Sequence, residues 1–220
     1  DSVRTAAREA LDRFPVIDGL VLSVGALIQG GPNVLASGHE AMFATNVMGP
    51  FLFTNLLLDR MEQADGLVLH VVASFDKALD WDDLESIERH RPMAAFNRTK
   101  GCNRVIAGEL ARRYAGRISS VAFDPTFVLD KSDPELKSRW PSGFAGMVWS
   151  LMSIFRAKPP EIAGEPLAEL MLANQDRASI NGALFVLDRR STKRDEAMHD
   201  AVQGRRLWER LEHLTEPAPA

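Results

Sequence analysis

Small or polar residues follow three apolar runs of the chain, each at the point where a strand would end. Gly25 follows the first run, Ser74 the second and Thr126 the third. If these runs are parallel strands of one sheet, their carboxyl ends meet at one edge, which is where open α/β sheets bind ligands. The Ser74 hydroxyl could take part in such a site, or it could only cap its own strand end. The pattern predicts a binding site at this edge.

The histidines and the cysteine offer neither a nucleophile relay nor a metal site. His70 precedes Ser74 by four residues on the same strand face, but at ~3.3 Å per residue the two lie roughly 13 Å apart. No two of the five histidines stand at ligand spacing. The single cysteine, Cys102, excludes an internal disulfide and a cysteine-based zinc site. We predict no metal centre and a structural role for His70.

The elements that must position the site can be read from the periodicity of apolar residues. Four runs have the character of strands buried on both faces of a parallel sheet: residues 16–24, 67–73, 118–123 and 182–187. Helical patterns accompany them at residues 3–14, 40–61, 94–114, 161–172 and 194–214. Helices that alternate with apolar strands predict an α/β fold with a parallel sheet flanked by helices, here in a single domain over 1–220.

Two irregular features are expected within this frame. Gly49-Pro50 should bend the helix at 40–61, because proline lacks the N–H that continues the helical hydrogen bonds. The segment after the strand at 67–73 is rich in carboxylates and should form an exposed loop; these are Asp76, Asp80, Asp82 and Asp83.

The composition is that of a soluble globular protein, with 45% apolar and 25% charged residues. A net charge of −4, with basic residues scattered, gives no surface for a nucleic acid backbone. The longest apolar tract, 144–155, is too short to cross a bilayer, and no signal peptide is recognisable. We therefore expect a cytoplasmic protein without a membrane span.

Five stretches resemble, in order and spacing, successive motifs of the short-chain dehydrogenase/reductase family. They are IDGLVLSVG at 17–25, TNVMGPFLFT at 45–54, VVAS at 71–74, FNRTK at 96–100 and FDPTFV at 123–128. The helix NRTKGCNRVIAGELARRY and the endings GALFVLDRR and RRLWERLEHLT are similar to the retinol-dehydrogenase-like branch. The resemblance implies a Rossmann-like sheet and an NAD(P)-dependent oxidoreductase of an alcohol or carbonyl compound.

The resemblance also carries the family's catalytic groups onto this chain. The catalytic asparagine falls on Asn46, the substrate-polarising serine on Ser74 and the cofactor-ribose lysine on Lys100. Asn46 could equally be structural at the bent helix, and Lys100 could be inherited without a ligand. The catalytic tyrosine falls on Phe96, four residues before Lys100 and one turn away on the same helix face. Because a phenyl ring has no proton to exchange, an acid worth on the order of 10²–10⁴-fold in rate is missing.

Further departures from the family pattern concern the cofactor side. Asp124 replaces a histidine often found before the proline–glycine pair, and an ionised carboxylate is a poor acid at neutral pH. The family's proline–glycine turn reads Pro125-Thr126, and its NNAG segment reads LSVG at 22–25. If a nucleotide binds at all, the resemblance assigns its contacts to Lys100, Gly25 and Thr126.

The chain begins inside what would be the family's third helix, and it contains no G-x-G phosphate loop. We therefore expect a truncated Rossmann-like sheet and no cofactor, with NAD(P) only if an upstream half exists. Without the first strands, the strand at 16–24 becomes an apolar edge, which a homodimer or another partner should cover. The side chains Met147, Trp149, Met152 and Phe155 are expected in the core or in a lid over an apolar substrate.

Three functions fit these observations. The first is a degenerate family member repurposed for a non-redox step, such as a cyclisation, elimination or isomerisation of an apolar small molecule in a biosynthetic pathway. The second is an NAD(P)-dependent oxidoreductase of an apolar alcohol or carbonyl whose cofactor half is missing from this chain. The third is a non-catalytic binding or scaffold protein. The absence of a tyrosine at Phe96 favours the first reading.

Overall fold

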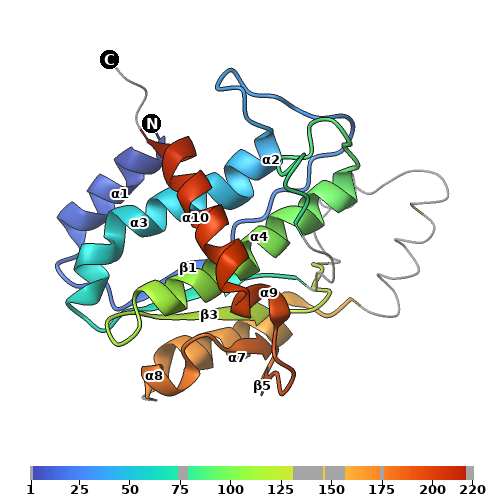
Figure 1. Ribbon diagram of the computed structural model, residues 1–220. Helices are drawn as coiled ribbons and strands as arrows, with labels where there is room; N and C mark the ends of the chain where they lie inside the picture. The colour runs from blue at the N-terminus through green and yellow to red at the C-terminus, as the bar shows by residue number, and fades with distance from the viewer. Residues whose placement is uncertain (1, 74–78, 131–145, 147–156, 174–175, 217–220) are drawn as a thin grey trace.

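The computed structural model describes residues 2–73, 79–130, 146, 157–173 and 176–216, which form a sheet covered by helices on both faces (Figure 1). The strands are neighbours in chain order: β1 (Gly19–Leu22), β2 (Leu67–Val71), β3 (Ser119–Asp124), β4 (Leu184–Val186) and β5 (Arg189–Arg190). The pairs from β1 to β4 are parallel, and β5 turns back antiparallel on β4. The predicted α/β fold with a Rossmann-like parallel sheet is confirmed.

One face of the sheet carries most of the helices. They are α1 (Ser2–Arg13), α2 (Ala41–Phe43), the π-helix η1 (Ala44–Met48), α3 (Gly49–Glu62), α4 (Pro92–Arg113), α9 (Glu196–His199) and α10 (Ala201–Thr215). The other face carries α7 (Pro160–Leu172) and α8 (Arg177–Ile180). The predicted helix at 194–214 is two helices, because Asp195 caps α9 and Asp200 caps α10 with side-chain hydrogen bonds.

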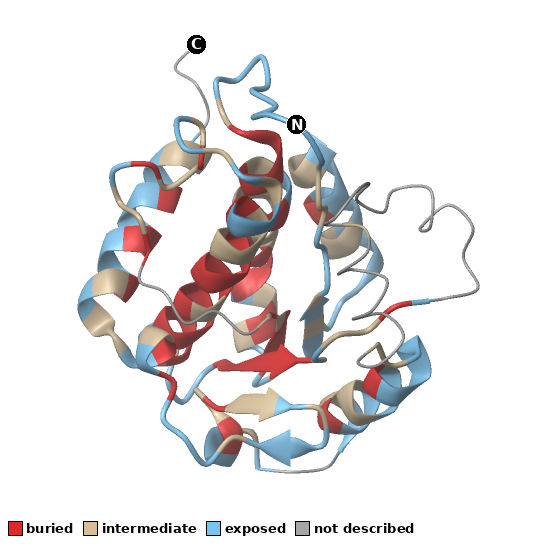
Figure 2. Ribbon diagram, turned by 90° about the vertical axis from the view of Figure 1, so that its right-hand side faces the viewer, coloured by how far each residue is buried: buried red, intermediate tan, exposed pale blue. Residues whose placement is uncertain are grey.

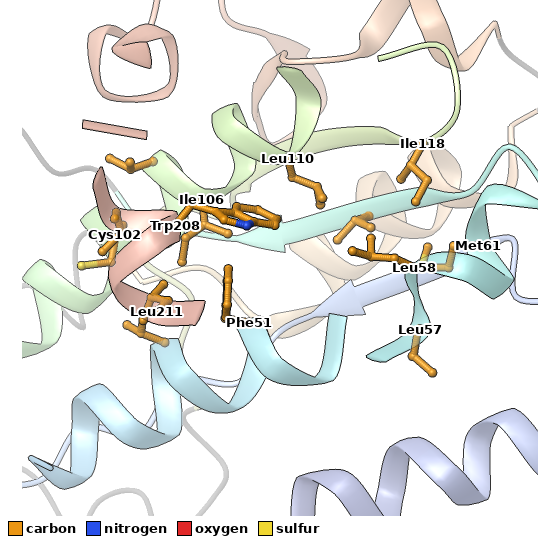
Figure 3. Close-up of a cluster of buried hydrophobic side chains, with 14 of the residues drawn as sticks. Phe51, Leu57, Leu58, Met61, Cys102, Ile106, Leu110, Ile118, Trp208 and Leu211 are labelled. Carbon is orange, nitrogen blue, oxygen red and sulfur yellow. The ribbon is translucent and has the colours of Figure 1, made fainter. Parts of the chain in front are cut away.

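Alternation along the strands divides the core between the two faces. In β2, Val68 belongs to the cluster under α3 and α4, whereas Leu67 and Leu69 pack with α7. Figure 2 shows the buried residues gathered in the central strands and the helices packed on them. In the larger cluster, the rings of Phe51 and Trp208 pack edge to face, with their centres 4.9 Å apart (Figure 3). This contact joins α3 to the C-terminal α10.

The irregularity predicted at Gly49-Pro50 is a π-helical turn, η1, which directly precedes Gly49. The Gly49 N–H reaches back five residues to the Ala44 carbonyl. Pro50 cannot supply the N–H that would bond the Asn46 carbonyl, and the Asn103 side chain on α4 donates to that carbonyl instead, at 3.0 Å. The irregular turn is therefore completed by a neighbouring helix, which the local sequence could not show.

The continuous helix at Ala41–Glu62 has the length and the mean hydropathy, 1.4, that a membrane span would need. Half of that apolar window is buried inside the structure, however, against the sheet and the helices α1 and α4. Such packing is typical of a core helix.

β1 is an edge strand of the described sheet, as expected for the run at 16–24. It is shorter than predicted, because only residues 19–22 pair with β2. Val21 and the following Val24 are exposed. The expectation that a second copy or another partner covers this edge stays a prediction.

The expectation of exposed carboxylates after β2 is wrong for Asp83, which is 6% exposed. Its carboxylate accepts hydrogen bonds from the backbone N–H groups of Ile87, Glu88 and Arg89 and so organises the loop before α4. Burial alone would raise the pKa of Asp83, but these hydrogen bonds and the charge of Arg98 lower it. Asp82 is exposed as predicted, and Asp76 lies outside the described residues.

Candidate active site at the carboxyl ends of β1 and β2

The Lys100 ammonium lies where the carboxyl ends of β1 and β2 meet. Its Nζ donates to the carbonyl of Val24, just beyond β1, and to the carbonyl of Val71, the last residue of β2, each at 3.1 Å. Lys100 is 5% exposed, and burial lowers the pKa of its ammonium from the ordinary 10.5 to about 8. A buried cation that is held by two carbonyl dipoles therefore marks the predicted edge.

Asn46 holds the loop that follows β1. Its side chain accepts the Ala26 N–H at 2.8 Å and donates to the Ala26 carbonyl at 2.9 Å and to the Thr99 hydroxyl at 3.1 Å. Asn46 is fully buried, and these bonds occupy both of its N–H donors. The structural reading of Asn46 is thus the one that the geometry supports, because the side chain positions the loop and keeps no donor for a ligand.

Gly25 lies between these two anchors, with the Val24 carbonyl held by Lys100 and Ala26 held by Asn46. A Cβ on Gly25 would stand 3.0 Å from Lys100 Nζ and 3.7 Å from the Phe96 ring. The absence of a side chain is therefore what lets the lysine approach the strand end so closely. Gly25 forms a small recess against which both Lys100 and Phe96 are placed.

Phe96 precedes Lys100 by one turn of α4, as the spacing predicted. The Lys100 Nζ lies 5.7 Å from the centre of its ring, within the range of a cation–π interaction. The Phe96 carbonyl accepts a hydrogen bond from the Thr99 hydroxyl, which links this turn to Asn46. The ring itself brings neither a donor nor an acceptor to the recess.

Asp124 and Thr126 stand at the end of β3, one strand further along the sheet. Asp124 is 5% exposed, and its Oδ1 accepts the Thr126 N–H at 2.8 Å, which closes a local turn. Thr126 has φ +62°, a conformation that favours glycine, at the position where the family has its glycine. Thr126 therefore holds a backbone conformation that glycine would adopt with less strain.

Other predicted site residues lie outside the described part of the chain. These are Ser74 and the apolar cluster of Met147, Trp149, Met152 and Phe155. A hollow of about 530 Å³ between the loop after β2 and α10 is lined by other residues, among them Trp81, Glu88 and Arg206. It does not include Lys100 or Gly25.

Two residues that support the site were not identified from the sequence. Asn103 bonds the Asn46 carbonyl, and Arg104 forms an ion pair with the buried Asp195 and contacts the Ala73 carbonyl at 3.5 Å. Both follow Lys100 by three or four residues, so they share its helix face. That spacing was the available signal, because polar residues on an otherwise buried helix face usually have partners.

No protein-family model matches the chain, but individual proteins do. Human retinol dehydrogenase 13 is 27% identical over 216 residues, which is 94% of this chain and 63% of that protein. A short-chain dehydrogenase/reductase of Armillaria gallica is also 27% identical, over 96% of this chain and 69% of its own length. In sequence and in fold, the chain is similar to members of the short-chain dehydrogenase/reductase family. The resemblance drawn from the motifs, including its retinol-dehydrogenase-like character, is confirmed.

Solved structures agree with this family in fold. A short chain dehydrogenase/reductase from Saccharomyces cerevisiae has a TM-score of 0.61 at 16% identity, over 90% of this chain and 74% of its own. The 3-ketoacyl-(acyl-carrier-protein) reductase from Brucella melitensis, complexed with NADH, has a TM-score of 0.56 at 22% identity, over 84% and 71% of the two chains. The chain spans 63% of the length of retinol dehydrogenase 13, so an activity of the whole protein is a matter for proposal.

Proposed function

We propose that this family member acts as an NAD(P)-dependent oxidoreductase on an apolar alcohol or carbonyl compound. The observation that carries the proposal is the buried Lys100 ammonium, held beside Gly25 by the carbonyls at the ends of β1 and β2. Open α/β sheets bind their ligands at this edge. The preference for an apolar substrate follows from the relatives named retinol dehydrogenase and from the Phe96 ring, which gives the recess an apolar wall.

The residues of the recess fit the nicotinamide end of such a cofactor. Lys100 uses two of its three ammonium donors on Val24 and Val71, and the third can reach an oxygen of a bound molecule. Gly25 is exposed and has no side chain that would cover the strand end. A reduced nicotinamide, when bound, supplies the hydride for the carbonyl carbon. The part of this chain would be to present the Lys100 ammonium to the bound molecule and to keep the loop at Gly25 in place with Asn46.

Calorimetric titration of the folded chain with NADH and with NADPH tests the cofactor part of the proposal. We expect a dissociation constant in the micromolar range for one of the two nucleotides. Gly25→Ala should weaken that binding at least tenfold, because its methyl group would displace the Lys100 ammonium. Gly164→Ala is the matched control, since a Cβ there meets nothing within 4 Å. If neither nucleotide binds to the folded protein, the proposal is wrong.

A second candidate, the non-redox conversion of an apolar carbonyl compound, is favoured by one observation. Phe96 offers no proton at the place where the family has its tyrosine, so ordinary hydride chemistry lacks its usual acid. Retinaldehyde can serve as the apolar probe, incubated with the protein in the absence of any nucleotide and then separated by chromatography. An isomerised or rearranged product would support the second candidate. Conversion that occurs only with a nicotinamide nucleotide would exclude it.

A further inference from the structure

We propose that Lys100 is the proton donor for carbonyl reduction in this chain, in the role that the family gives to the tyrosine absent at Phe96. The inference rests on the proposed oxidoreductase function and names the group that completes it. It assigns to the lysine a step that goes beyond holding a cofactor ribose. Three features of the site lead to it: the position of Nζ, its hydrogen bonds, and the surrounding groups.

Lys100 Nζ and the Phe96 ring both lie beside Gly25. Both Lys100 Nζ and the Phe96 ring contact the same point, the missing Cβ of Gly25, at 3.0 and 3.7 Å. Because the two residues are one helical turn apart, their side chains converge on one ligand position. A carbonyl oxygen that lies against Gly25 would therefore have the ammonium within reach.

The hydrogen bonds of Lys100 leave it suited to this role. The carbonyls of Val24 and Val71 accept two of its N–H groups, which leaves the third N–H for a ligand. The described residues form no ion pair with the ammonium. Burial is the cause that lowers the pKa of Lys100 to about 8, and an acid works best when its pKa lies near the working pH.

The other titratable groups at this end of the sheet are poorer donors. Burial raises the pKa of the Cys102 thiol to about 12, and burial lowers the pKa of His70 to about 3, so that the imidazole is neutral and carries no acidic proton. Asp124 is committed to the Thr126 N–H. Other charged groups on the surrounding elements include Glu40 on the approach to α2, Arg98 and Arg104 on α4, and Asp195, which pairs with Arg104.

The proton step balances as follows. The carbonyl carbon gains a hydride from the reduced nicotinamide, and its oxygen becomes an alkoxide. An N–H bond of the Lys100 ammonium breaks, an O–H bond forms to that oxygen, and the electron pair stays on nitrogen. The neutral amine then regains a proton from solvent. Reduction therefore requires the protonated lysine and should decline above the pKa of Lys100.

The first test needs no cofactor and no turnover. The ¹³C shift of the lysine Cε atoms is followed by NMR from pH 6 to pH 11 in the unliganded protein, and the Lys100 signal is the one missing from Lys100→Met. We expect this signal to titrate near pH 8, below the ordinary lysine pKa of 10.5. If Lys100 titrates near pH 10.5, the inference is overturned.

The second test compares three proteins in the nucleotide-dependent reduction of retinaldehyde. Lys100→Arg keeps a cation but no exchangeable acid near neutral pH, so reduction should fall on the order of 10²–10⁴-fold. Lys193→Arg is the matched control on an exposed lysine and should reduce at the wild-type rate. Phe96→Tyr should change the rate less than tenfold, because the site already has its donor.

The outcomes separate this inference from the proposed function. A rise of a hundredfold or more in Phe96→Tyr would overturn the role of Lys100 and leave the oxidoreductase proposal intact, because a missing phenol would then have limited the rate. Wild-type turnover in Lys100→Arg would do the same. Failure of the wild type to bind either nucleotide would overturn both. A fall in Lys100→Arg with unchanged nucleotide binding supports the inference.

Discussion

The Asp124 carboxylate accepts the Thr126 N–H at 2.8 Å and holds a β-branched residue at φ +62°. A residue with a side chain destabilises the folded state by about 1–2 kcal/mol in this conformation. Glycine removes this strain, but it also raises the conformational entropy of the unfolded chain, which offsets part of the gain. We expect Thr126→Gly to raise the free energy of unfolding by about 0.5–1 kcal/mol, measured by urea denaturation. Thr126→Ala, which stays strained, should show a smaller gain. A loss of stability in the glycine variant would contradict this account of the turn.

The buried His70 should make the fold sensitive to acid. Burial lowers the pKa of His70 from 6.5 to about 3. Between these pH values His70 is therefore protonated in the unfolded chain and neutral in the folded chain. The free energy of unfolding should therefore fall as the pH drops from 7 towards 3, by about 1.4 kcal/mol for each pKa unit crossed. His70→Leu should flatten this fall, as followed by chemical denaturation at successive pH values. His213→Leu, on an exposed histidine, should behave like the wild type.

The ionisation of Lys100 should affect the free energy of unfolding at alkaline pH. Because burial lowers the pKa of its ammonium from 10.5 to about 8, the folded state binds fewer protons between these values, and the free energy of unfolding gains a contribution that rises with pH. The raised pKa values of Cys102 and Tyr114 act against this rise above pH 9. We therefore compare the wild type with Lys100→Met, in which only the lysine contribution is removed. The variant should be more stable by about 3 kcal/mol at pH 7 and by little at pH 10. A constant difference would argue against a perturbed lysine.

Gly108 lets α4 and α9 approach closely. A Cβ on Gly108 would overlap the backbone carbonyl of Met198, and neither helix can yield without losing packing. We expect Gly108→Ala to destabilise the protein by about 1–3 kcal/mol or more in thermal and urea unfolding. The same substitution at Gly164, on the open side of α7, should stabilise by about 0.5–1 kcal/mol, because alanine favours the helix. Equal effects at the two sites would show that α4 and α9 are not in such contact.

The hydrogen bond between Asn103 and the Asn46 carbonyl should depend on Pro50. Asn103→Leu leaves that buried carbonyl without its partner, at a cost of about 1–3 kcal/mol. Pro50→Ala restores an N–H that can reach the carbonyl from within the helix. The double variant should therefore lose less stability than the sum of the single variants, as a double-mutant cycle of unfolding free energies would measure. Strict additivity would mean that the proline does not create the need for Asn103.

The elements of this fold that lie in a single stretch of chain were predictable. Fully apolar runs gave β2 and β3, because a strand covered on both faces must be apolar throughout. The same pattern also located β1, although this edge strand is exposed at alternate residues. The helical period of about 3.6 residues placed Phe96 and Lys100, which are four residues apart, one turn apart on α4. Boundaries shifted where capping or a turn intervened, as at Asp200, which divides the predicted C-terminal helix. Strand β5 has only two residues and left no periodic signal.

The candidate site divides in the same way. The sequence by itself determined which residue types stand at the strand ends, that position 96 has no phenol, and that Lys100 follows it at helical spacing. Only the tertiary structure decided that the Asn46 side chain hydrogen-bonds to Ala26 and Thr99 and that Asp83 is buried. It also decided that Lys100 is held by two backbone carbonyls beside Gly25. The physical reason is that burial and hydrogen bonding at this site come from segments far apart in the chain, and a pKa responds to those partners and not to the neighbours in sequence.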